Sequence, residues 1–220
     1  MTNRLFSIIL FLLAATATNT ANAFGSGTKA VGDITLTNGS RLEAVSLELP
    51  CERDTQVKVV IDGKKEKLEA DSIQSMVIWK AKCPEQKHLF VPFYAEFVDL
   101  ETGEVTGIAK RLIWCCLDEV RDHASYWIEI GRPTFKKCNL RFNFRSMYSY
   151  ASMTYILKRG SDHPCYVPDS EKNKKKWIRV YFADDPEVIR KLDAGEYQTG
   201  KLANKHTDLR RIIADYNPQK

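Results

Sequence analysis

ITLTNGSRLEAVSL, residues 34–47, is the stretch that decides how the fold begins. Apolar and polar residues alternate on both sides of Asn38-Gly39, and this dipeptide between alternating segments is the strongest short signal for a β-hairpin. A second tight turn is expected at Asp62-Gly63, and further strands are expected over residues 55–61, 64–68 and 76–79. Five short strands with tight turns favour a small SH3-like β-barrel, because a barrel closes the edges of its own sheet. We predict this barrel module over residues 24–82.

The rest of the chain favours an antiparallel β body, which we predict over residues 83–220. Alternation is clearest over residues 138–145, and a long hairpin is expected over residues 88–117. Further strands are expected over residues 126–130, 148–157 and 177–182, and a polar loop over residues 163–176.

The pattern changes to a helical period at the C-terminal end. Asp185 precedes Pro186, which is typical of a helix start, and Gly195 ends the apolar spacing that follows. Thr207 is expected to cap a second helix, whose apolar residues through Tyr216 share one face. The chain is therefore predicted to be α+β and mostly β, with two C-terminal helices.

Residues 1–23 have the three parts of a secretory signal peptide. Arg4 precedes a short apolar segment, and Ala21-Asn22-Ala23 is the small-residue pattern at which export peptidases cut. The apolar segment is about half the length of roughly 20 residues that a bilayer-spanning helix needs. We therefore expect a periplasmic or secreted protein whose mature chain begins at Phe24, with an uncleaved anchor as the less favoured alternative.

Charge and hydropathy exclude some partners of the mature chain. The leader holds one arginine and no acid, so its removal lowers the formal net charge from +5 to +4. This is too mild for the basic surface of a nucleic-acid-binding domain. The mean hydropathy is −0.35, and no second apolar segment is long enough to span a membrane.

All six cysteines lie after the leader, and an even count in an exported chain predicts disulfides. The sequence leaves fifteen pairings open, and we favour Cys51 with Cys83 because they bracket the first module. Cys115 and Cys116 are neighbours in a predicted strand, so their side chains should point to opposite faces. We interpret His163-Pro164-Cys165 as a turn held by proline, with its cysteine in a disulfide.

Short patterns resemble uncharacterised exported proteins of Bacteroides-type bacteria. The segments that carry the resemblance are the two predicted tight turns, Asp71-Ser72-Ile73, residues 180–186 and residues 209–217. It implies an envelope or secreted location and a β body with a helical tail, and it brings no activity. Asp71-Ser72-Ile73 is also similar to the acceptor pattern for O-glycosylation in these bacteria, which would modify Ser72; a turn serine explains the same residues.

No motif points to catalysis, a metal or a cofactor. The four histidines lack a paired ligand spacing, and Cys-x-x-Cys, Gly-x-Ser-x-Gly and glycine-rich phosphate loops are missing from the sequence. Catalytic groups can still meet in space, so a hydrolase acting on envelope glycan or peptide stays the alternative.

The leading hypothesis is an exported, non-enzymatic binding or structural protein of the cell envelope. Four candidate binding residues follow one another around the strand at residues 138–145: Arg141, Arg145, Tyr148 and Tyr150. Arginine and tyrosine are enriched where proteins meet partners, and the expected partner is a protein or glycan of the envelope. A solvated sheet face explains the same residues.

Overall fold

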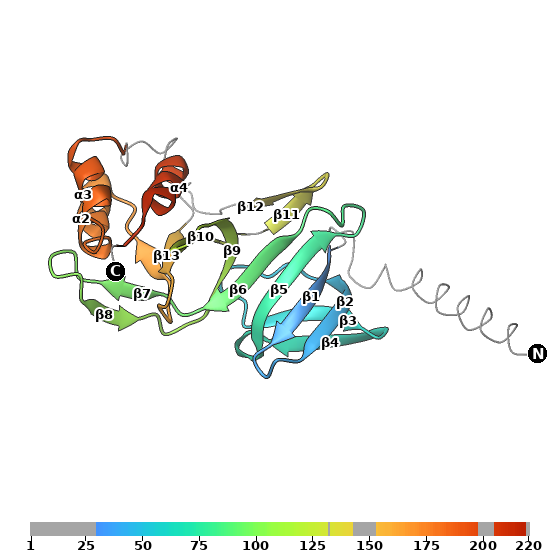
Figure 1. Ribbon diagram of the computed structural model, residues 1–220. Coiled ribbons are helices and arrows are strands. Elements are labelled where there is room, and N and C mark those ends of the chain that lie inside the picture. The colour runs from blue at the N-terminus through green and yellow to red at the C-terminus, as the bar shows by residue number, and fades with distance from the viewer. Residues whose placement is uncertain (1–29, 132, 143–152, 198–204, 219–220) are drawn as a thin grey trace, which may run out of the picture.

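The computed structural model describes residues 30–131, 133–142, 153–197 and 205–218, which form a mostly β structure with helices at its C-terminal end (Figure 1). The strands are β1 (Ala30–Leu36), β2 (Arg41–Leu47), β3 (Gln56–Ile61), β4 (Lys64–Glu69), β5 (Ile73–Lys80), β6 (His88–Phe93), β7 (Glu96–Val98), β8 (Val105–Ile108), β9 (Ile113–Val120), β10 (Ala124–Glu129), β11 (Pro133–Lys136), β12 (Asn139–Phe142), β13 (Thr154–Lys158) and β14 (Cys165–Val167). The helices are η2, a 3₁₀ turn (Ala70–Ser72), α2 (Glu171–Tyr181), α3 (Pro186–Asp193) and α4 (Lys205–Asp215).

Both predicted tight turns are confirmed. Gly39 has a φ of +85°, and its amide donates to the Leu36 carbonyl at 2.9 Å, which closes the β1–β2 hairpin. Asp62 and Gly63 both have positive φ, as a type I′ turn requires, and they join β3 to β4.

The predicted SH3-like barrel is not confirmed. The described strands form one large sheet in the order β4-β3-β2-β1-β5-β6-β9-β10-β13-β14-β7-β8, together with the separate hairpin β11-β12, and none of them closes into a barrel. Instead of ending a barrel at residue 82, β5 pairs with β6, so that Val77 lies opposite Leu89. Neighbouring strands in the sheet are antiparallel except β14 and β7.

The sheet must curl at its C-terminal half. Only Tyr94 and Ala95 lie between β6 and β7 along the chain, yet four strands lie between them in the sheet. The three Cα steps from Phe93 to Glu96 span at most about 11 Å. Five strand spacings of a flat sheet cover about 24 Å, so the sheet bends back on itself to bring β14 to β7.

Three helices are described where two were predicted. α2 covers residues 177–181 of the strand predicted over 177–182, together with part of the loop predicted over 163–176. Ser170 caps this helix by accepting a hydrogen bond from the Asn173 amide, and the helix buries Lys174, Trp177 and Ile178 on one face. The predicted helix start at Asp185 is confirmed, because its carboxylate accepts from the amides of Glu187 and Val188.

Two hydrophobic cores stabilise the fold. One lies among β1–β6 and β9 and includes Ile34, Met76 and Phe90, while the other lies between the C-terminal helices and β10, β13 and β14 and includes Trp177 and Ile213. In Figure 1 the helices gather at one end of the sheet, away from β1–β4. This arrangement leaves the helix-free face of the curled sheet to a third, smaller cluster.

The disulfide joins Cys83 to Cys138, so the predicted pairing of Cys83 with Cys51 is wrong. The turn after β5 holds Cys83, and the β11–β12 turn brings Cys138 to it, with the two Cα atoms 5.8 Å apart. The prediction that Cys165 forms a disulfide is also wrong. Its buried thiol is free and accepts a hydrogen bond from the Trp177 indole at 3.2 Å.

Candidate functional site

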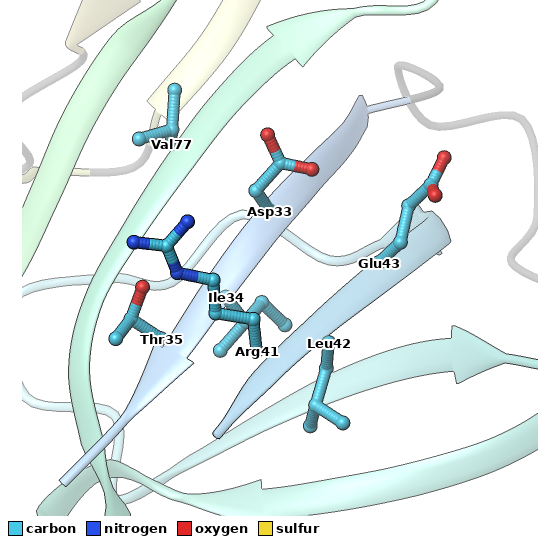
Figure 2. Close-up of a pocket in the computed structure, with 7 residues that line it drawn as sticks. All are labelled: Asp33, Ile34, Thr35, Arg41, Leu42, Glu43 and Val77. Carbon is cyan, nitrogen blue, oxygen red and sulfur yellow. The ribbon is translucent and has the colours of Figure 1, made fainter. Parts of the chain in front are cut away.

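A depression on β1, β2 and β5, lined by both charged and apolar side chains, is the candidate site (Figure 2). It has a volume of about 490 Å³ and is lined by Asp33, Ile34, Thr35, Arg41, Leu42, Glu43 and Val77. The strand register explains the lining, because side chains directly opposite each other lie on the same face. Asp33 is opposite both Glu43 and Val77, and Thr35 is opposite Arg41.

The charged groups of this depression are available to a ligand. Asp33, Arg41 and Glu43 are exposed, and within the part of the chain that the structure describes they make no ion pair or side-chain hydrogen bond with another residue. Figure 2 shows the Arg41 side chain lying across β1, with the carboxylates of Asp33 and Glu43 at the other side of the depression. Val77 adds an apolar side chain from the neighbouring strand β5, so the site offers hydrogen-bond donors, hydrogen-bond acceptors and an apolar contact.

An aromatic cluster lies farther along the same sheet, on the curled part. Its rings are those of Phe93, Trp127, Tyr155 and Tyr166. The Phe93 centroid is 5.8 Å from Trp127 and 5.7 Å from Tyr155 in edge-to-face geometry, and Tyr155 is 5.9 Å from Tyr166. Such pairs add stability beyond burial, so the cluster serves first as a core for the bend of the sheet.

Glu129 is the buried acid next to this cluster. Its side chain is 8% exposed, and the Tyr155 hydroxyl donates to its Oε2 at 3.5 Å. Burial raises the pKa of Glu129 to about 7, and the negative charge of Glu52 adds to this effect, while Arg53 opposes it. A carboxyl group with a pKa near neutrality can hold or release a proton under physiological conditions.

The four binding residues predicted from sequence are not brought together in the described structure. Arg141 lies exposed on β12, opposite Thr134 of β11. Arg145, Tyr148 and Tyr150 lie outside the described residues. The clustering of these side chains therefore stays a prediction.

Ser72, the predicted glycosylation site, ends the 3₁₀ turn before β5. Its hydroxyl donates to the Glu69 carbonyl at 2.7 Å, and its own carbonyl accepts from the Thr37 amide at 2.9 Å. The side chain is half-buried. These contacts give Ser72 a structural part in the turn, and modification of the residue stays a prediction.

The buried thiols are held in the protonated form. Cys115 faces the aromatic cluster and Cys116 the first core, which confirms that these neighbours point to opposite faces. Burial raises the pKa of Cys116 to about 12 and raises that of Cys115 well above its ordinary value. A protonated thiol is a poor nucleophile and a poor metal ligand.

One group of possible metal ligands occurs in the described residues. The sulfurs of Cys83 and Cys138 and a carboxylate oxygen of Glu85 lie within 4.8 Å of one another. Since the two sulfurs are bonded to each other, they offer no thiolates, and the group is explained by the disulfide.

The depression and Glu129 were both missed by the sequence analysis. Alternation around Asn38-Gly39 does place Asp33 and Thr35, and likewise Arg41 and Glu43, on one face of their strands. The alignment of both strands with Val77 depends on pairing with β5, which no local pattern reveals. Glu129 lies within the strand predicted over residues 126–130, whose pattern carries no sign of its burial.

No family model, curated protein or solved structure matches the chain. Among the described residues, none of the helices combines the length and the apolar character needed to cross a membrane.

Proposed function

We propose that the chain is an exported, non-enzymatic binding protein of the cell envelope that holds a glycan in the depression of Figure 2. The observation that carries the proposal is that the charged groups beside Val77 make no ion pair with any other residue the structure describes. The Cys83–Cys138 bond supports export, since disulfides persist mainly in oxidising compartments outside the cytosol.

The composition of the lining favours a hydroxyl-rich ligand. The carboxylates of Asp33 and Glu43 accept hydrogen bonds from sugar hydroxyls, and the guanidinium of Arg41 donates to ring or hydroxyl oxygens. Val77 offers an apolar contact for a sugar ring face. Two acids face one arginine, so the local charge repels phosphorylated or other polyanionic polymers and favours neutral or amino sugars.

Binding to an array of neutral, amino and acidic glycans tests the proposal, followed by calorimetry with the best ligand. Asp33→Asn removes a charged acceptor and should weaken binding about 10- to 100-fold, since a hydrogen bond to a charged group contributes about 1.5–3 kcal/mol. Asp62→Asn makes the same change at the exposed β3–β4 turn and should leave affinity unchanged. The proposal fails if no glycan binds, or if both variants weaken binding equally.

Glu129 favours a second function, hydrolysis of envelope glycan or peptide. A general acid needs a raised pKa, and Glu129 has one, with Glu52 close enough to act on its charge. Incubation of the purified protein with envelope polysaccharide and peptidoglycan fragments tests this alternative by mass spectrometry of the products. Cleavage that Glu129→Gln abolishes would establish the hydrolase; intact substrates would leave binding as the function.

A further inference from the structure

The two edge strands of the large sheet differ in the charge of their exposed side chains. β4 forms one edge, and five of its six residues are charged: Lys64, Lys65, Glu66, Lys67 and Glu69. β8 forms the other edge, and Val105–Ile108 carries no charge although all four residues are exposed. Charged side chains are the usual protection of an edge against strand addition, so β4 carries this protection, whereas β8 carries no charge and is limited only by its short length and a bulge.

None of the described strands pairs with the outer side of β8. On its inner side β8 pairs with β7, where Glu96 lies opposite Ile108, Phe97 opposite Gly107 and Val98 opposite Val105, so Thr106 is the extra residue of a bulge. Val105 is 55% exposed and Ile108 48%, which is high for large apolar side chains. An edge strand leaves alternate backbone donors and acceptors pointing outward, and an extended polypeptide segment is the partner that satisfies them in series.

The charges that flank β8 favour a second copy of this chain as the partner. Glu104 lies three residues before Gly107 and Lys110 three residues after it. If two copies of β8 pair antiparallel about Gly107, Glu104 of one copy lies opposite Lys110 of the other. The twofold axis forms this pair twice, as a self-complementary interface requires.

The flanking charges have no competing partner in the chain itself. Over the described residues, Glu104 and Lys110 are exposed and make no ion pair. The same register places Val105 opposite Ala109 and Thr106, the extra residue of the bulge, opposite Ile108, so two β-branched side chains meet in the second of these pairs. We propose that two copies of the protein associate through β8 into one continuous antiparallel sheet. This association is independent of the ligand bound at the depression.

Sedimentation equilibrium of the purified protein tests the proposal, over about 10–500 µM because a single strand pair makes a small interface. The unaltered chain should dimerise reversibly in this range. Glu104→Lys places two like-charged pairs across the interface and should weaken association about tenfold or more. Combining Glu104→Lys with Lys110→Glu restores opposite charges and should restore the dimer.

Two further variants test whether association depends on the β8 edge rather than on surface charge elsewhere or on loss of the fold. Lys64→Glu reverses a charge on the protected edge β4 and should leave the dimer unchanged. Thr106→Pro introduces a residue that disfavours strand addition and should abolish the dimer, with unchanged circular dichroism showing that the fold is kept. The proposal is overturned if the unaltered chain stays monomeric throughout the concentration range. It is also overturned if the double variant Glu104→Lys with Lys110→Glu does not regain the dimerisation that Glu104→Lys weakens.

Discussion

Removal of the Cys83–Cys138 bond gives the sharpest prediction about stability. The bond joins the turn after β5 to the β11–β12 turn and closes a loop of 55 residues. In the chain-entropy treatment, a loop of this length stabilises the folded state by about 4 kcal/mol at 25 °C. For a chain of this size each kcal/mol moves the melting temperature by about 2–4 °C, so the loss is about 8–16 °C.

The assay is thermal unfolding followed by circular dichroism, with and without dithiothreitol. The double variant Cys83→Ala with Cys138→Ala should melt at the lower temperature and be insensitive to the reductant. The melting temperature of the unaltered chain should fall to a similar value only when the disulfide is reduced. Cys51→Ala is the matched control and should keep both the high melting temperature and the response to reductant. A double variant melting within about 2 °C of the unaltered chain would refute the reasoning.

Three further predictions concern single side chains. The pKa of Glu129 is raised from 4.5 to about 7, so the folded state keeps a proton that the unfolded state releases in this interval. The free energy of unfolding should therefore fall by up to about 3 kcal/mol between pH 4.5 and pH 7, and Glu129→Gln should remove this part of the pH dependence in urea titrations. Asp185 is 3% exposed; its Oδ1 accepts from two α3 amides, and its Oδ2 accepts from the Asn217 amide at 2.6 Å. Asp185→Ala should lower the free energy of unfolding by about 2–3 kcal/mol in the same assay, and an effect below about 0.5 kcal/mol would contradict the capping role. Protein from the native host should carry a glycan mass that Ser72→Ala removes, and an intact mass without any increment would exclude the modification.

The local parts of the fold could be predicted from the sequence, because their causes are local. Asn38-Gly39 and Asp62-Gly63 form tight turns whichever strands they later join. Asp185 caps α3 through amides two and three residues away. The curl of the sheet depends instead on the parallel pairing of Cys165 with Glu96, which are 69 positions apart in the sequence and share no pattern.

The error at α2 has an identifiable cause. Trp177 and Ile178 favour strands by propensity, and the lysines before them suggested a solvated loop. The helix forms because Ser170 caps its start and because residues 174, 177 and 178 bury one face against the core. A polar cap followed by apolar residues at helical spacing was the signal that could have shown it.

Only part of the candidate site could be predicted from the sequence. Alternation fixed which residues of β1 and β2 share the polar face, but the depression exists only because β5 adds Val77 beside Asp33. The disulfide pairing could not be predicted from the sequence for the same reason, because the β11–β12 turn meets Cys83 only in the folded chain.

The proposed envelope function depends on export of the chain, and the intact mass of the protein recovered from fractions of its native host tests this most directly. The account predicts a chain that begins at Phe24, found outside the cytosol, with the bond between Cys83 and Cys138 formed. A cytosolic chain that retains Met1 and carries six reduced cysteines would contradict it.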